Sequence, residues 1–303
     1  LWMCSTPIMP VPMTPYRIRD LCSAMRRSVE PFATLEQMSD DRLYFRQLLS
    51  GQDFAAGDML AEQMVNFVYA IGDRVTGECV LVDPAYAVGD IVDAVAADDM
   101  TVTGVLATHY HPDHVGGSMM GHTIEGVAAL LDRVDCPIHI HADESEWVTK
   151  TTGVGAKHLV QHASGDVLTV GAVDIRMLHT PGHTPGSQCF LVDGRLVAGD
   201  TLFLEGCGRT DLPGSNPAEM ADSLRRLSQV PDETILFPGH RYSAASSASL
   251  RASADPGFAA RASIRFFGCG VTLFWGWRGW ASFRSLVKYS IHSCSTFSKY
   301  SGL

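Results

Sequence analysis

Apolar and polar positions alternate in short segments over residues 41–243. The apolar segments 66–71 and 79–84 lie on either side of the polar stretch GDRVTG, and this arrangement predicts two paired strands. Between residues 87 and 97 the apolar positions follow a helical period instead, so we expect an amphipathic helix there. Its apolar face consists of Val88, Ile91, Val92 and Val95.

Two more helices are predicted from their start signals. Thr123 is a candidate N-cap for a helix whose apolar positions are Ile124, Val127, Ala128 and Leu131. Asn216 and Pro217 open another helix, in which Met220, Leu224 and Leu227 share one face. Further strands are expected at 102–109, 137–142, 174–180, 188–194, 195–200 and 234–240. This succession predicts a packed α/β domain over residues 41–243, without internal repeats.

The two ends of the chain lack this pattern. Residues 1–40 are rich in Met and Pro, and we expect a flexible leader outside the fold rather than a signal peptide, because prolines interrupt the apolar run. Residues 244–303 are basic and aromatic, and their longest apolar run, 266–277, is too short to span a bilayer. A membrane-surface or partner-binding tail is one interpretation. The abrupt end of the strand pattern favours a poorly ordered extension.

Composition narrows the function. Hydrophobic residues make up 46 % of the 303 residues, which is enough for a large core, and the net charge of −10 argues against nucleic acid as a partner. The eight cysteines form no C-x-x-C pair, as expected for reduced thiols in a cytoplasmic protein.

The stretch THYHPDH at residues 108–114 places four costly polar groups directly after an apolar strand. His109 and His111 lie two residues apart, so on an extended backbone both rings project to the same side. Asp113 and His114 follow where the chain would turn. One strand end and one tight loop could thus supply ligands to two neighbouring metal ions.

Three other ligand-type residues also follow short apolar strands: His183, Asp200 and His240. Five histidines and two aspartates suit zinc, and they also suit iron or manganese. Two divalent ions about 3.5–4 Å apart, bridged by a carboxylate and a hydroxide, would use all seven residues, with the hydroxide as the nucleophile.

The motifs THYHPDH, PGHTPGS, GDTLF, GCGRTD and FPGH occur in this order. Together they resemble the metallo-β-lactamase-fold hydrolases, and most closely the branch of hydroxyacylglutathione hydrolase (glyoxalase II) and the persulfide dioxygenases. The resemblance covers about residues 41–243. It implies a four-layer αβ/βα sandwich, in which two facing mixed sheets are flanked by helices and the metals lie at one edge.

The resemblance also implies roles for individual residues. The first metal would be held by His109, His111 and His183, and the second by Asp113, His114 and His240. Asp200 would bridge the two ions, and Asp83 would steady the His-rich loop from behind. Arg209 is a candidate for binding an anionic substrate and Tyr242 for polarising a carbonyl, whereas Cys207 is expected to be a buried thiol.

The remaining histidines are given structural roles. His139 and His141 are expected to be satisfied polar residues at a sheet end, and His179 to be packed or to contact a ligand from behind. His122, His158, His162 and His292 are expected on the surface or in loops.

Two departures from the family matter. The interval between His111 and His183 is long and contains an extra stretch, MMGHTIEGVAALLDRVD, expected to be a helix, which affects the local pocket shape. The second departure affects the expected substrate. Glyoxalase II proper ends in a helical glutathione-binding domain, whereas here the unusual tail follows His240. GCGRTD is closer to the dioxygenase-like branch, in which one iron is held by two His and one Asp.

Three functions remain open from the sequence. The first is a hydrolase with two metal ions, zinc being favoured, that cleaves a thioester or related ester, with Asp113 and Asp200 as the catalytic carboxylates. The second is a mononuclear Fe(II) persulfide dioxygenase using His109, His183 and Asp200. The third is a metal-binding protein without catalysis. For either enzyme we expect a small thiol-derived substrate and no membrane partner, and a homo-oligomer is compatible with the sequence.

Overall fold

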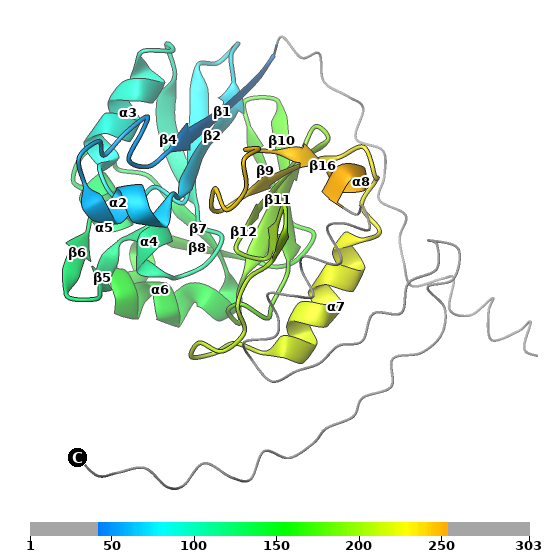
Figure 1. The fold of residues 1–303 in the computed structure, drawn as a ribbon. Helices are drawn as coiled ribbons and strands as arrows, with labels where there is room; N and C mark the ends of the chain where they lie inside the picture. The colour runs from blue at the N-terminus through cyan, green and yellow to red at the C-terminus, as the bar shows by residue number, and fades with distance from the viewer. Residues whose placement is uncertain (1–41, 254–303) are drawn as a thin grey trace, which may run out of the picture.

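The computed structural model describes residues 42–253, which form two six-stranded sheets that face each other (Figure 1). The predicted leader at 1–40 and the part of the predicted tail beyond residue 253, including His292, lie outside the described residues.

The first sheet has the strand order β1-β2-β3-β4-β7-β8. Its strands are β1 (Leu43–Leu49), β2 (Phe67–Asp73), β3 (Glu78–Val82), β4 (Thr101–Leu106), β7 (Ile138–His141) and β8 (Leu159–His162). Strands β1 to β3 are antiparallel and β3, β4, β7 and β8 are parallel, so the sheet is mixed. The predicted strand pair is confirmed as β2 and β3, with Asp73 opposite Glu78.

The second sheet has the order β16-β15-β12-β11-β10-β9. Its strands are β9 (Val167–Val170), β10 (Val173–His179), β11 (Gln188–Val192), β12 (Arg195–Gly199), β15 (Ile235–Pro238) and β16 (Ala248–Ser249). Only the pairing of β12 with β15 is parallel among the pairs of this sheet. Because β16 pairs with β15, the sheet continues beyond residue 243, where the strand pattern in the sequence fades.

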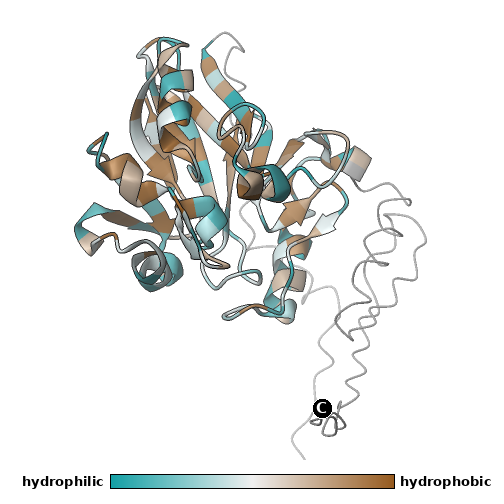
Figure 2. Ribbon diagram, turned by 60° about the vertical axis from the view of Figure 1, so that its left-hand side comes forward, coloured by the Kyte–Doolittle hydropathy of each residue, from teal (hydrophilic) through white to brown (hydrophobic). Residues whose placement is uncertain are grey.

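The alternation of side chains along each strand creates separate apolar clusters on the two faces of each sheet. On β3, Val80 and Val82 pack in the cluster between the two sheets, whereas Cys79 and Leu81 pack in the cluster beneath the helices of the first sheet. Strand β11 alternates in the same way between the central cluster and a third cluster on the outer face of the second sheet. Figure 2 shows the apolar strands enclosed by more polar helices and loops.

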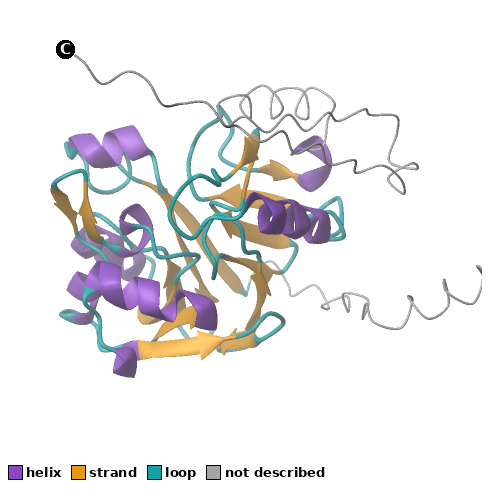
Figure 3. Ribbon diagram, turned by 90° about the horizontal axis from the view of Figure 1, so that it is seen from below, coloured by secondary structure: helices purple, strands orange, loops and turns teal. Residues whose placement is uncertain are grey.

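Helices cover both outer faces (Figure 3). Those packed on the first sheet are α2 (Met59–Met64), α3 (Val88–Ala96), α4 (Pro112–Val115), α5 (Val127–Leu131) and α6 (Ser145–Thr152). The second sheet is covered by α7 (Pro217–Leu227) and α8 (Leu250–Ser253). Two 3₁₀ turns, η1 (Ala142–Glu144) and η2 (Ala156–His158), and two small hairpins complete the described fold. The expected four-layer αβ/βα sandwich is confirmed.

Two of the predicted helices are confirmed. The amphipathic helix expected at 87–97 is α3, with Val88, Ile91 and Val95 buried. Helix α7 begins at Pro217, and the side chain of Asn216 accepts hydrogen bonds from the backbone N–H groups of Ala218 and Glu219.

The helix predicted behind Thr123 is wrong at its start. Residues His122–Ile124 form strand β6, which pairs with β5 (Gly117–Met119), and α5 begins only after Gly126. Met120 and Gly121 have φ values of 51° and 82°, as a two-residue hairpin turn requires. The turn therefore determines the local structure, although the apolar spacing also suits a helix.

Within residues 42–253 no helix is long and apolar enough to cross a membrane. The four cysteines of this part of the chain are all free thiols.

Candidate metal centre

The THYHPDH segment begins where β4 ends, at the edge shared by the carboxyl ends of the parallel strands. His111 precedes α4, whose first residue is Pro112. Proline suits this position because the first N–H of a helix has no intrahelical partner. This short helix turns Asp113 and His114 back toward His109, and all three side chains are buried.

The structure brings all seven predicted ligands to one place. Two groups have ligand atoms close enough to share an ion: His109, His111 and His183, and Asp113, His114 and His240. In the first group His111 Nδ1 lies 3.0 Å from His183 Nε2. In the second group the Nε2 atoms of His114 and His240 are 3.2 Å apart.

Asp200 lies between the two groups. Its Oδ1 atom is 3.4 Å from the Nε2 atoms of both His114 and His240, and its Oδ2 atom is 3.6 Å from His183 Nε2. Asp200 directly follows Gly199, which has a φ of 47°, and a Cβ at Gly199 would lie 2.5 Å from Thr108 Oγ1. Glycine thus allows the end of β12 to approach the His-rich loop closely.

Three histidines are held in place through hydrogen bonds from their Nδ1 atoms. The Nδ1 atom of His114 donates to Asp83 Oδ2 at 2.9 Å, that of His183 to the Arg209 carbonyl at 2.8 Å, and that of His240 to the Met64 carbonyl at 2.7 Å. Carboxylate and carbonyl oxygens only accept hydrogen bonds, so each Nδ1 carries a proton. In the neutral imidazole the Nε2 lone pair then faces the site.

The same logic applies to His109. Thr108 Oγ1 donates to Asp83 Oδ2 at 2.5 Å and therefore accepts from His109 Nδ1 at 2.9 Å. Among the described residues, His109 Nε2 and Asp200 Oδ1 are buried polar atoms without a hydrogen-bond partner. These two atoms present lone pairs that no proton satisfies, and a cation would satisfy them. The donor set therefore fits divalent metal ions.

The electrostatics of the site also favour a cation. Burial lowers the pKa of His114, but Asp113, Asp200 and Asp83 outweigh it and raise the pKa to about 10. Burial, together with neighbouring His114, holds the pKa of His109 well below its usual value. Burial raises the pKa of Asp200, but His240 and His114 outweigh it, so the pKa is well below its usual value. The Asp200 carboxylate thus keeps its charge and would attract a metal ion.

Sequence reasoning missed Asn66, which supports the second group. Its Nδ2 atom lies 3.0 Å from the Asp113 carbonyl and 3.2 Å from Asp113 Oδ2, and donates to both. Tyr86 in turn donates its hydroxyl proton to Asn66 Oδ1 at 3.2 Å. The polar Asn66 at the start of an apolar strand was the available signal.

Glu144 was also missed. Its carboxylate is buried and accepts three hydrogen bonds, from Tyr110 N, Thr184 Oγ1 and Gly186 N. Burial raises the pKa of Glu144 to about 7 against the effect of these hydrogen bonds. In the sequence it stands in the acidic stretch ADESE, which is typical of an exposed helix start.

The residues predicted to contact substrate have other contacts as well. The guanidinium of Arg209 donates to both oxygens of Asp211, at 2.7 and 2.8 Å, while the Arg209 carbonyl holds His183. The Tyr242 ring stacks on His240 with 4.8 Å between centroids, and it is 45 % exposed. Burial raises the pKa of Cys207 to about 12, so it remains a thiol.

Four of the other histidines, His139, His141, His162 and His179, form a separate cluster. His139 Nδ1 lies 2.8 Å from His162 Nε2, and His141 accepts from the Asp143 backbone N–H. The His141 and His179 rings stack face to face, with centroids 3.6 Å apart at 8°. In-plane lone pairs of stacked rings run parallel, so this arrangement favours packing over a shared ion, although Asp143 lies nearby.

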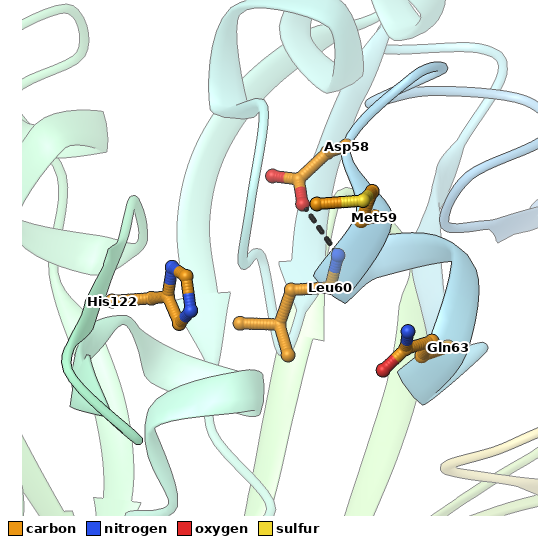
Figure 4. A pocket seen from close by; sticks show the side chains of 5 residues that line it. All are labelled: Asp58, Met59, Leu60, Gln63 and His122. Atoms are coloured by element: carbon orange, nitrogen blue, oxygen red, sulfur yellow. Dashed lines mark hydrogen bonds between the residues drawn. The ribbon is translucent and has the colours of Figure 1, made fainter.

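A pocket lies between the first turn of α2 and strand β6 (Figure 4). It is lined by Asp58, Met59, Leu60, Gln63 and His122, and Asp58 caps α2 through Leu60 N at 2.8 Å. None of the seven predicted ligands lines this pocket.

Comparison with known proteins places this centre in a family. A curated hydroxyacylglutathione hydrolase from Rhodopseudomonas palustris (strain BisA53) is 37 % identical over 182 residues, which cover 59 % of this chain and 64 % of the relative. The chain thus spans somewhat less than two thirds of that relative's length. An uncharacterised protein from Aquifex aeolicus (strain VF5) is 36 % identical over 56 % of this chain and 82 % of the relative.

Solved structures agree. ETHE1 from Myxococcus xanthus has a TM-score of 0.55 and 32 % identity, covering 69 % of this chain and 80 % of that one. TTHA1623, solved in a di-iron-bound form, has a TM-score of 0.50 and 27 % identity, covering 66 % of this chain and 94 % of that one. The family profile described as Metallo-beta-lactamase superfamily matches residues 63–240, which include all seven predicted ligands. The chain therefore belongs to the metallo-β-lactamase superfamily.

Proposed function

We propose that this protein is a metal-dependent hydrolase that cleaves a thioester or related ester at a two-metal centre. The observation that carries the proposal is the position of Asp200, whose two oxygen atoms face different groups of ligands. A carboxylate in this position suits two ions better than one. Zinc is the favoured metal, because nitrogen and carboxylate ligands suit it.

In this proposal each group would hold one ion. His109, His111 and His183 would bind the first, Asp113, His114 and His240 would bind the second, and Asp200 would contact both. When bound, two such ions lower the pKa of a water molecule toward neutrality and polarise a substrate carbonyl. The protein itself orients the metal ligands. The Asp83 carboxylate and the carbonyls of Arg209 and Met64 accept hydrogen bonds from the Nδ1 atoms of three of the histidines.

The relatives support the choice of substrate class. The name hydroxyacylglutathione hydrolase belongs to curated relatives at 33–38 % identity. We propose a small thiol-derived substrate, which Arg209 and Tyr242 would contact at the rim of the site, and a cytoplasmic location. The carrier thiol is left open, because the chain spans only 64 % of the length of the hydroxyacylglutathione hydrolase from Rhodopseudomonas palustris.

Metal content and oxygen uptake test this proposal. Protein purified without added metal and then loaded with zinc should hold two ions per chain and cleave a thioester without consuming oxygen. The matched control is the His141→Ala protein, which should do the same because His141 lies in the separate cluster of stacked rings. Zinc-loaded protein that leaves all thioesters intact would contradict the hydrolase assignment.

A second candidate is a mononuclear iron dioxygenase that oxidises a persulfide. Similarity to ETHE1 favours it, as do the unsatisfied atoms His109 Nε2 and Asp200 Oδ1. With His183 they would form a site of two histidines and one carboxylate, which suits Fe(II). Iron-dependent oxygen consumption with a persulfide substrate would establish this alternative.

Metal binding should release protons. The pKa of His114 is raised to about 10 and that of His240 is also raised, since their neighbours Asp113 and Asp200 outweigh burial. The His114 imidazole is therefore protonated near neutral pH in metal-free protein, and a metal must displace this proton from Nε2. The affinity of the protein for zinc should therefore fall as the pH is lowered. Calorimetric zinc titrations in buffers of different ionisation enthalpy should show about one or more protons released, and heats independent of the buffer would contradict the prediction.

A further inference from the structure

Glu144 connects the two loops that carry the ligands of the first group. Its Oε1 atom accepts from Tyr110 N at 2.7 Å, between His109 and His111, and from Thr184 Oγ1 at 2.8 Å, beside His183. Its Oε2 atom accepts from Gly186 N at 2.7 Å. One carboxylate therefore holds segments that are more than 70 residues apart in the chain.

The contact is closely packed. Glu144 is 1 % exposed, and a Cβ added at Gly186 would lie 2.6 Å from both Glu144 N and Glu144 Oε2. The turn around His183 is closed on the other side by hydrogen bonds from Thr180 N to the Ser187 carbonyl and from Thr184 N to Ser187 Oγ. A displacement of Glu144 would therefore be transmitted to His183 and to the backbone between His109 and His111.

The second group is held by other residues. Asp83 and Asn66 contact His114 and Asp113, and the Met64 carbonyl fixes His240. In the described part of the chain, the Glu144 carboxylate hydrogen-bonds to Tyr110, Thr184 and Gly186 and to no residue of that group. We infer that Glu144 is a positioning residue that sets the metal affinity of the site formed by His109, His111 and His183. This inference rests on the proposed two-metal function.

The variant Glu144→Gln tests the inference with little change in shape. A carboxylate accepts all three hydrogen bonds, whereas the glutamine amide must place its NH₂ group against Gly186 N–H or, if flipped, against Tyr110 N–H. Either arrangement opposes two donors and loosens one loop. We expect about a 10–100-fold loss of affinity for one metal ion, the range typical when supporting partners of ligands are lost.

The experiment is a chelator competition with zinc that resolves two dissociation constants. His183→Ala and His240→Ala proteins assign each constant to its group. The zinc dissociation constant that rises in Glu144→Gln should belong to the site that is lost in His183→Ala. The other dissociation constant should change by less than about threefold. Thr184→Val, which removes a single hydrogen bond to Glu144, should weaken the same constant by a smaller factor and serves as the second variant.

Asp73→Asn is the matched control. Asp73 is fully buried and, like Glu144, accepts hydrogen bonds from backbone N–H groups, here those of Val75 and Ala172. It is the last residue of β2 and pairs with Arg42, whereas Asn66 of the metal centre directly precedes the first residue of that strand. Its loss should lower the melting temperature and leave both zinc constants unchanged. Two unchanged constants in Glu144→Gln, or both weakened equally, would overturn the inference. Wild-type protein that binds no zinc would refute the proposed function, and the inference with it.

Discussion

Replacing Asp200 by Asn should lower the metal stoichiometry and reduce turnover by several orders of magnitude while the fold persists. Asparagine keeps the shape of the side chain but removes its negative charge. Two unit charges 4 Å apart repel by about 4 kcal/mol at an effective dielectric constant of about 20, and two divalent ions repel about four times as strongly. The Asp200 carboxylate lies between His183 of the first ligand group and His114 and His240 of the second. Without its negative charge, the site should not hold two metal ions together.

The measurement is metal content after gel filtration, together with turnover and circular dichroism. His141→Ala is the control and should retain both metal and activity, because His141 belongs to the separate histidine cluster. An Asp200→Asn protein with two ions and near-native turnover would show that Asp200 does not bridge.

The positions of the predicted ligands could be anticipated because each follows a short apolar strand. His109 follows β4, Asp200 follows β12 and His240 follows β15, and in the structure these ends converge. Strand ends are easy to recognise because a polar ligand interrupts an otherwise buried run. The strand and helix pattern alone predicts only an α/β domain, and the resemblance to the metallo-β-lactamase fold implies the sandwich. Central strands are continuously apolar because both faces of each sheet are covered.

Other features could not be predicted because their cause is tertiary. Strand β1 has three partly exposed residues in its middle, so neither a helical nor a strand period is evident. In the sequence Glu144 stands in an acidic stretch that is typical of an exposed turn, and only the tertiary fold brings Tyr110 and Gly186 against it. The start of α5 was misplaced because the hairpin turn at Met120 and Gly121 has no recognisable Asn-Gly pair.

His240→Asn should separate the two candidate reactions. His240 uses Nδ1 to donate to the Met64 carbonyl and presents Nε2 to the second group. The asparagine amide can replace the Nδ1 donor but has no atom at the position of Nε2. The substitution therefore removes one ligand of the second group while preserving the contact that anchors the loop, and the stability of the fold should change little.

For a two-metal hydrolase, His240→Asn should retain one zinc ion and lose turnover by several orders of magnitude, because the second ion is needed for the reaction. For a mononuclear iron enzyme, the proposed ligands His109, His183 and Asp200 are untouched, so iron content and persulfide-dependent oxygen uptake should be largely kept. Tyr242→Phe is the matched control, because it preserves the ring stacked on His240 and should leave metal content unchanged. Full thioester turnover by His240→Asn with a single ion would contradict the two-metal proposal, since catalysis would then need only the first group and Asp200.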